Sequence, residues 1–213
     1  MPRIRKCTPY INMDPVLIAG ASSVGSLVLD KICLKLLACF VKHRKRDRAI
    51  VAILGKTELC KSVYNLHDEN FHVVDVEGET MNSLKDETKM TLAELEKTGN
   101  FAQRNRLFNL YAKAYVIALR KNFRGGRFLF VTSSHTMALF ACGIEKYLIQ
   151  TVLPTGRFCD VITAEMDQLD RSDFETKKTE ALRKSGDRNL LVFDSWDALT
   201  QAILVEHKLS LRL

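Results

Sequence analysis

The chain has 213 residues, of which 46% are hydrophobic and 27% charged, and its formal net charge is +7 at pH 7. These values are typical of one folded globular domain, with or without an appendage, and they exclude a largely disordered chain. The excess of basic residues favours an anionic partner, which would be a nucleotide, a nucleic acid or an acidic membrane surface.

The six cysteines lie in apolar runs and form no C-x-x-C pair. This distribution argues against a zinc site and against a disulfide framework. Reduced cysteines packed as small apolar side chains are typical of an intracellular protein, so the sequence predicts a cytoplasmic location.

Residues 1–48 are predicted to form an N-terminal helical and basic extension, followed by an α/β domain over 49–213. The uncharged run 15–29 ends at Asp30 and is too short to span a bilayer, so no transmembrane span is expected. A basic run over 42–48 separates the two parts. It is interpreted as a solvated linker or as a contact with nucleic acid or anionic lipid.

Short apolar runs alternate with helical patterns after this break. Strands are predicted from runs rich in Val, Ile and Phe, and helices from apolar residues at helical spacing. The expected strands are 49–54, 71–76, 127–132, 158–163 and 190–194. The expected helices are 80–98, 101–122, one capped by Ser133 or Ser134 and running to about Leu153, and 196–207.

Nearly continuous apolar strands separated by helices predict an α/β three-layer sandwich around a doubly wound, mainly parallel sheet. The sheet would have five strands, or six if Val16–Ala19 is also a strand. Ligands of such folds bind beyond the carboxyl ends of the strands. We therefore expect four segments to open on one rim: Gly55–Ser62, Asp75–Glu77, Thr132–His135 and Asp194.

The segment Gly55–Ser62 fits the phosphate-binding pattern G-x-x-x-x-G-K-[ST] except at Cys60, which replaces the second glycine. Gly55, Lys56 and Thr57 would open the loop. Lys61 would reach the outer phosphates and Ser62 would hold magnesium. Asp75, at the end of the next strand, would orient magnesium, a sugar hydroxyl or the phosphate acceptor. The side chain of Cys60 would crowd the phosphates.

From residue 49 onward the chain resembles the P-loop nucleoside and nucleotide kinases. The likeness rests on the near-match loop 55–62, the strand ending at Asp75, the arginine-bearing insertion 80–124 and the charged segment 165–188. It implies binding of ATP or GTP with magnesium and phosphoryl transfer to a nucleoside or nucleotide. Lys61 and Asp75 would then be catalytic. The arginines of the charged segment would close over the phosphates, and they are Arg171, Arg183 and Arg188. Because Cys60 departs from the pattern, the chain could also be a descendant of such kinases without catalytic activity. It would then still bind a nucleotide, or it would have lost the nucleotide as well.

A second hypothesis is an NADP-binding, short-chain type oxidoreductase. Gly20 and Gly25 would form its glycine turn, and Lys56 would bind the 2′-phosphate of the cofactor. Ser134 and Tyr147 have the separation of the pair that activates a carbonyl in such enzymes. Thr151 stands where the partner lysine is expected.

A third hypothesis is a non-enzymatic, viral or structural protein that binds RNA or assembles, including with itself as a homo-oligomer. Its candidate surface is the basic series along the helix 101–122 and just beyond it. Aromatic residues of that helix are expected to face the core instead. The series consists of Arg104, Arg106, Lys113, Arg120, Lys121, Arg124 and Arg127. His135, at a strand end, is a candidate acid–base group or part of a helix cap.

Overall fold

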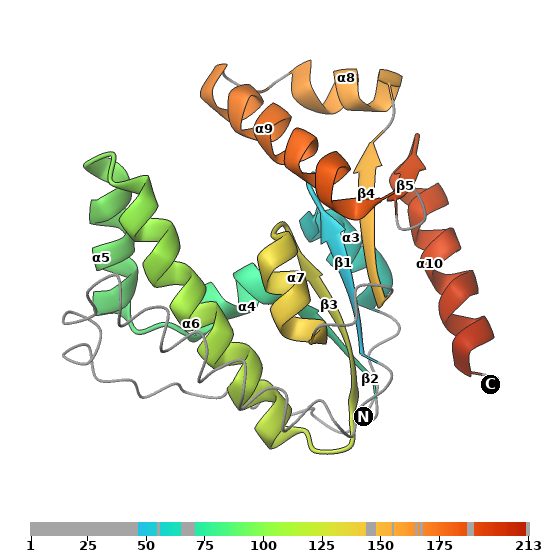
Figure 1. Cartoon of the computed structure of the whole chain (residues 1–213), viewed down its shortest axis with the longest axis horizontal. Coiled ribbons are helices and arrows are strands. Elements are labelled where there is room, and N and C mark those ends of the chain that lie inside the picture. Colours follow the sequence, from blue (N-terminus) through green and yellow to red (C-terminus); the bar gives the residue numbers. More distant parts are fainter. Residues whose placement is uncertain are drawn as a thin grey trace, which may run out of the picture. The chain divides into compact units, whose positions relative to one another are not determined.

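The computed structural model describes residues 47–211, with the exception of 55, 65–70, 144–147, 155, 165, 167 and 187–189 (Figure 1). Within its helices, the side chains at 58, 62, 156, 162, 169, 170 and 204–211 are also outside the description. The predicted extension 1–48 therefore lies outside the described residues, apart from its last two. The candidate strand Val16–Ala19 and the glycines Gly20 and Gly25 lie outside them as well.

The described chain divides into two compact units. One consists of residues 76–124, and the other of residues 47–75 and 125–211. The second unit contains the whole sheet and every strand end at which a ligand site was predicted.

The sheet has five parallel strands in the order β2-β3-β1-β4-β5. These strands are β1 (Arg48–Ala52), β2 (Phe71–Asp75), β3 (Arg127–Thr132), β4 (Ile149–Pro154) and β5 (Leu190–Phe193). The central strand β1 is buried from Ala49 to Ala52 because both of its neighbours and both layers of helices cover it. A continuous apolar run is the sequence signature of such a strand.

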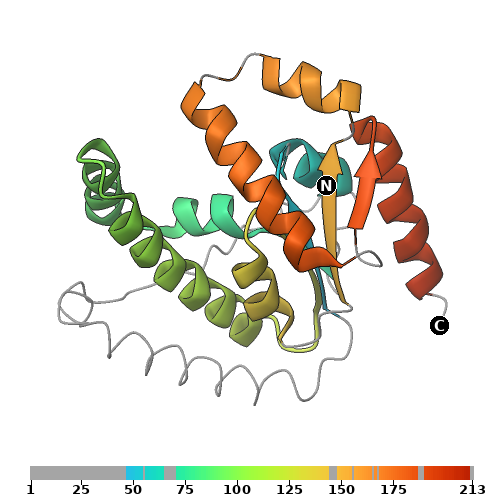
Figure 2. The same ribbon diagram turned by 45° about the horizontal axis from the view of Figure 1, so that its top comes forward.

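Helices cover both faces of this sheet. The helices α3 (Lys56–Val63) and α10 (Trp196–Leu211) contact each other on one face, whereas α7 (His135–Cys142) packs against β1, β3 and β4 and α9 (Gln168–Ser185) against β4. Figures 1 and 2 show α7 and α9 on the opposite face from α3 and α10. The predicted three-layer α/β sandwich with a doubly wound parallel sheet is confirmed, with five strands in the described chain.

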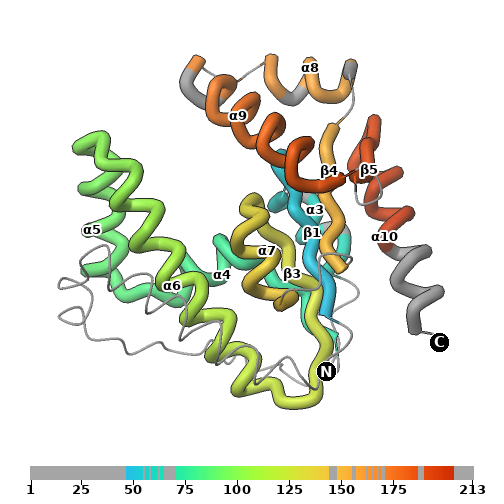
Figure 3. Tube along the Cα trace, viewed as in Figure 1, coloured from blue at the N-terminus to red at the C-terminus, as the bar shows by residue number. Residues whose placement is uncertain are grey.

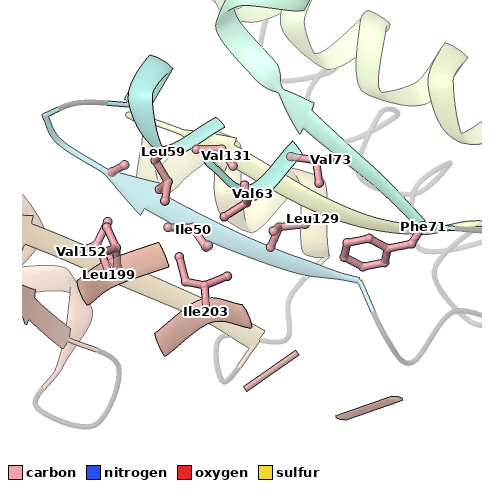
Figure 4. Close-up of a cluster of buried hydrophobic side chains, with 11 residues drawn as sticks. Ile50, Leu59, Val63, Phe71, Val73, Leu129, Val131, Val152, Leu199 and Ile203 are labelled. Carbon is pink, nitrogen blue, oxygen red and sulfur yellow. The ribbon is translucent and has the colours of Figure 1, made fainter. Parts of the chain in front are cut away.

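The core between the sheet and the α3–α10 layer is apolar (Figure 4). Leu59 and Val63 face it from successive turns of α3, and Leu199 and Ile203 do so from α10. Both pairs are four residues apart, which places each pair on one side of its helix. Burial of this face holds α3 on the sheet directly after β1.

Of the basic run 42–48, the structure describes only Asp47 and Arg48, and these two belong to the folded sheet rather than to a solvated linker. Asp47 is buried, and its Oδ1 accepts a hydrogen bond of 3.0 Å from the backbone N–H of Phe128. Its carboxylate therefore ties the start of β1 to β3. Arg48 is the first residue of β1 and pairs with Leu129.

The unit 76–124 consists of helices α4 (Val76–Ser83), α5 (Asp86–Lys97) and α6 (Phe101–Asn122). Leu84, Leu92 and Tyr111 form its small core. The helix predicted over 101–122 is confirmed residue for residue, and Asn100 caps it by accepting from the N–H of Gln103. The helix predicted over 80–98 is broken between Ser83 and Asp86. Figure 3 traces the three helices along the chain.

Two predictions between β3 and β5 are wrong. The helix expected to run to Leu153 ends at Cys142, where Gly143 at a φ of 76° stops it, and residues 149–154 form β4. The strand expected over 158–163 is part of the helix α8 (Gly156–Ala164). A short apolar run fits a strand or a buried helix equally well, so periodicity could not separate the two. A separate finding concerns membranes: none of the described helices is both long enough and apolar enough to cross one.

Candidate functional site

The connections that follow β1 and β3 pass to opposite faces of the sheet. After β1 the chain enters α3 on one face of the sheet, and after β3 it enters α7 on the other face. Since β1 and β3 are neighbours, their carboxyl ends flank the point at which the two connections separate. Open α/β sheets bind ligands at such a switch point. The candidate site is therefore the sheet edge around Lys56 and Thr132.

An ion pair lies at this edge. Lys56 is the first residue of α3, Asp75 is the last residue of β2, and the lysine Nζ is 2.6 Å from the carboxylate Oδ1. The strand β3 lies between β1 and β2, so the pair reaches across the carboxyl end of β3. The two side chains are only 17% and 21% exposed. Partial burial strengthens their attraction and keeps both charged groups in place at the rim.

The phosphate loop predicted over 55–62 does not have the expected form. Residues 56–63 are the helix α3, so the part of the loop that the structure describes is helical rather than extended. No residue from Lys56 to Val63 is a glycine or proline that would interrupt a helix, and Leu59 is completely buried against the core. Cys60, which replaces the second glycine of the pattern, is therefore a helical residue and not part of an extended phosphate loop. Cys60 is partly buried against the core.

This helix separates the predicted phosphate ligands. Lys61 is exposed in the last turn of α3, about 7–8 Å further along the helix axis than Lys56 at 1.5 Å per residue. Lys56 and Thr57 are in the first turn, and Thr57 is exposed. Gly55 and the side chain of Ser62 lie outside the described residues. The structure thus brings Lys56 and Asp75 together, and it places Lys61 at the other end of the helix.

Hydroxyl groups organise the neighbouring end of β3. Thr132 Oγ1 accepts a hydrogen bond of 3.1 Å from the N–H of Ser134, and Ser134 Oγ accepts one of 3.3 Å from the N–H of Met137. Ser134 is therefore the N-cap of α7, as the sequence predicted for Ser133 or Ser134. The oxidoreductase hypothesis pairs Ser134 with Tyr147, which lies outside the described residues.

His135 follows this cap and begins α7. It is half-buried, and its Nε2 is 3.4 Å from Thr151 Oγ1 on β4. Burial lowers the pKa of His135 below its usual value, the nearby ammonium of Lys184 lowers it further, and Glu180 opposes this shift. The imidazole is consequently neutral at pH 7. Sequence reasoning found His135 at the strand end but could not find Thr151, Glu180 and Lys184, because β4 and the end of α9 approach it only in the folded chain.

The two described arginines of the charged segment both lie on α9. The guanidinium of Arg171 donates a hydrogen bond of 3.0 Å to the backbone carbonyl of Thr163, in the last turn of α8. Arg183 is exposed in the last turn of α9. Arg188 lies outside the described residues. Arg171 therefore connects α8 to α9, a role that the sequence did not indicate.

The basic residues of α6 differ in their exposure to solvent within the unit 76–124. Arg106 and Lys121 are exposed, whereas Arg120 is buried and Arg104 lies 3.4 Å from the carboxylate of Glu96. Tyr111 and Tyr115 are also buried, as predicted for the aromatic residues of this helix. Only part of the predicted RNA-binding surface is therefore exposed.

In comparisons with known proteins, no family model matches this chain, and neither a curated protein nor a solved structure matches it. Over the part of the chain that the structure describes, no three His, Cys, Asp or Glu side chains gather in a group that could hold a metal ion. Among the described residues, Cys60, Cys142 and Cys159 are in no disulfide bond.

Proposed function

We propose that this chain binds a nucleotide through its phosphates at the carboxyl edge of the sheet, with Lys56 as the principal phosphate ligand. The observation that carries the proposal is the Lys56–Asp75 ion pair at the start of α3, next to the switch point between β1 and β3. In this proposal Lys56, and not Lys61, has the role of phosphate ligand that the sequence pattern gave to Lys61.

Three features favour a phosphate at this position. The ammonium of Lys56 is fixed by Asp75 instead of extending freely into solvent. The first turn of α3 provides backbone N–H groups and the positive end of a helix dipole, which attract an anion. The fold places both at the edge where doubly wound sheets bind their ligands.

Asp75 suits the magnesium ion that accompanies nucleoside triphosphates. Magnesium is commonly held by one or two carboxylates, with phosphates and water as its other ligands, so a single aspartate at the rim is sufficient. Asp75 would hold the ion beside the phosphates that Lys56 binds. If phosphoryl transfer follows, the chain contributes to it by positioning and by neutralising charge. Arg171 and Arg183 on α9 are the further candidates for contact with the phosphates. We also propose a cytoplasmic location, with which the reduced state of the described cysteines is in keeping.

A thermal-shift panel with ATP–Mg, GTP–Mg, NADP and a short single-stranded RNA tests the proposal. A ligand at one hundred times its dissociation constant stabilises the folded state by about 2.7 kcal/mol. For a chain of this size that raises Tm by roughly 5–10 °C. We expect a shift with ATP–Mg or GTP–Mg.

The variants Lys56→Ala and Lys61→Ala make this test specific. Each removes one lysine from α3, and each shift is measured against the variant's own Tm because Lys56→Ala also breaks the ion pair. We expect the nucleotide shift to disappear in Lys56→Ala and to persist in Lys61→Ala and Lys56→Arg. A nucleotide-induced Tm shift that is lost in Lys61→Ala instead would show that Lys61 binds the phosphate, as the sequence pattern predicts. A shift with NADP alone would support the oxidoreductase hypothesis.

RNA binding is the second candidate, and α6 favours it. This helix of 22 residues contains five basic residues and no acidic one. Arg106 and Lys121 are exposed on it. If RNA binds there, its affinity should fall with salt concentration and with the double substitution of Arg106 and Lys121 by Ala. Lys56→Ala should leave it unchanged.

A further inference from the structure

The strand β4 is shared by His135 of α7 and by the helix α9, and this arrangement makes α9 sensitive to the protonation of one histidine. His135 begins α7, and its Nε2 lies 3.4 Å from the hydroxyl of Thr151 on β4. The helix α9 packs against the same strand and buries Ala181 completely. It crosses the face of the sheet that also carries α7 (Figure 2).

The charges around His135 come from α9. Lys184 and Glu180 form an ion pair one helical turn apart, on either side of Ala181, and both act on the imidazole. Arg183 acts on Glu180. The strand β4 has no charged residue. The charged residues of β1 and β3 are Arg48 and Arg127, and they begin these strands at the opposite edge of the sheet.

A proton on His135 would be unfavourable for three reasons. It would place a positive charge in the first turn of α7, where the helix dipole is also positive. It would bring that charge close to Lys184, and it would charge a half-buried ring. Both nitrogens of the protonated ring would carry hydrogen, so the ring could only donate to Thr151 Oγ1 and could no longer accept from it.

The helix α9 is the neighbouring element that can respond most easily. Among its residues with described side chains, only Phe174 and Ala181 are buried, and most of the others are charged or polar and exposed. Elements with few buried apolar contacts open first. We propose that protonation of His135 loosens the C-terminal half of α9 from β4, so that the contact of α9 with β4 is an acid-sensitive latch.

The direction of the pH dependence follows from linkage. The unfolded chain has a histidine pKa of about 6.5, and the folded chain has a lower one at His135. Below about pH 6.5 the open state therefore binds more protons than the closed state, and the closed state loses stability as the pH falls toward the folded pKa. Above about pH 6.5 the closed state has the full stability that neutral His135 contributes.

Hydrogen exchange of the α9 amides, corrected for the intrinsic pH dependence of exchange, tests the latch. We expect protection over 174–185 to fall on acidification from neutral pH in the wild-type chain and to stay constant in His135→Gln, which is neutral throughout. The same loss of protection in both proteins would overturn the proposal.

A second pair of variants keeps His135 and does not depend on the folding of His135→Gln. Lys184→Gln removes the repelling charge, so the midpoint of the protection loss should move to higher pH. Glu180→Gln removes the attracting charge, so the midpoint should move to lower pH. Midpoints that stay in place, or move in the reverse directions, would show that His135 does not control α9. Nucleotide is absent from these measurements, so their outcome is independent of the proposed phosphate site.

Discussion

The hydrogen bond between Tyr115 and Glu79 gives a quantitative prediction for the unit 76–124. The hydroxyl of Tyr115 on α6 lies 2.6 Å from Glu79 Oε2 on α4, and the tyrosine side chain is 2% exposed. Burial and the adjacent carboxylate both raise the pKa of Tyr115, so the phenol is protonated at neutral pH and donates this bond.

Tyr115→Phe removes the donor without removing the ring. A hydrogen bond to a charged group contributes about 1.5–3 kcal/mol. Glu79 is only partly buried, so water recovers part of this loss. We expect the free energy of unfolding to fall by about 1–2 kcal/mol, within the range for a lost hydrogen bond whose acceptor can rehydrate. Urea denaturation followed by far-UV circular dichroism measures it, because the unit is helical.

Tyr111→Phe is the matched control. Tyr111 lies one turn earlier on α6 and is 6% exposed, and its hydroxyl makes no hydrogen bond with any described residue. Its loss should change the free energy of unfolding by less than about 0.5 kcal/mol. Glu79→Gln keeps an acceptor but removes its charge, so its effect should lie between the two. Equal stability of the Tyr115→Phe and Tyr111→Phe proteins would refute the reasoning.

Two further predictions concern the sheet unit. Leu59→Ala opens the fully buried core under α3 and should cost about 2–5 kcal/mol, measured by urea denaturation through the fluorescence of Trp196, which packs against the same cluster. The exposed Lys61→Ala on the same helix should cost little, and a similar loss in both would contradict the assigned core. Arg171→Ala removes an exposed hydrogen bond to Thr163 and should lower the free energy of unfolding by less than about 1 kcal/mol in a thermal melt. It should also reduce the nucleotide-induced Tm shift; an unchanged shift would leave Arg171 as a connection between α8 and α9 only.

Local patterns predicted most of the fold. The helix Phe101–Asn122 has a long apolar face, and the strand Arg127–Thr132 has four consecutive apolar residues at its centre, so local patterns were sufficient for both. Residues 149–154 and 158–163 were assigned to the wrong class because each is a short apolar run. Their class depends on whether a strand of the sheet or a helix of the outer layer covers them. The glycine stop at Gly143 was the local signal that could have ended α7 at the right place.

The candidate site was less predictable because it is built from long-range contacts. The sequence placed Lys56 and Asp75 at strand ends, but the phosphate-binding pattern assigned the phosphate to Lys61. Spacing along the chain cannot show that residues 56–63 are helical, since the burial of Leu59 and Val63 against the sheet determines this. The charges of Glu180 and Lys184 likewise act on His135 only once α9 packs against β4.

The direct test of the account is the dissociation constant of ATP–Mg, measured by titration calorimetry for the wild-type protein, Lys56→Ala and Lys61→Ala. If Lys56 is the phosphate ligand, its loss should weaken binding at least about tenfold, which is 1.4 kcal/mol. Lys61→Ala should bind within about twofold of the wild type, because its charge lies at the far end of α3. Equal affinity of the wild type and Lys56→Ala, or no binding by the wild type, would contradict a nucleotide site at the Lys56–Asp75 pair.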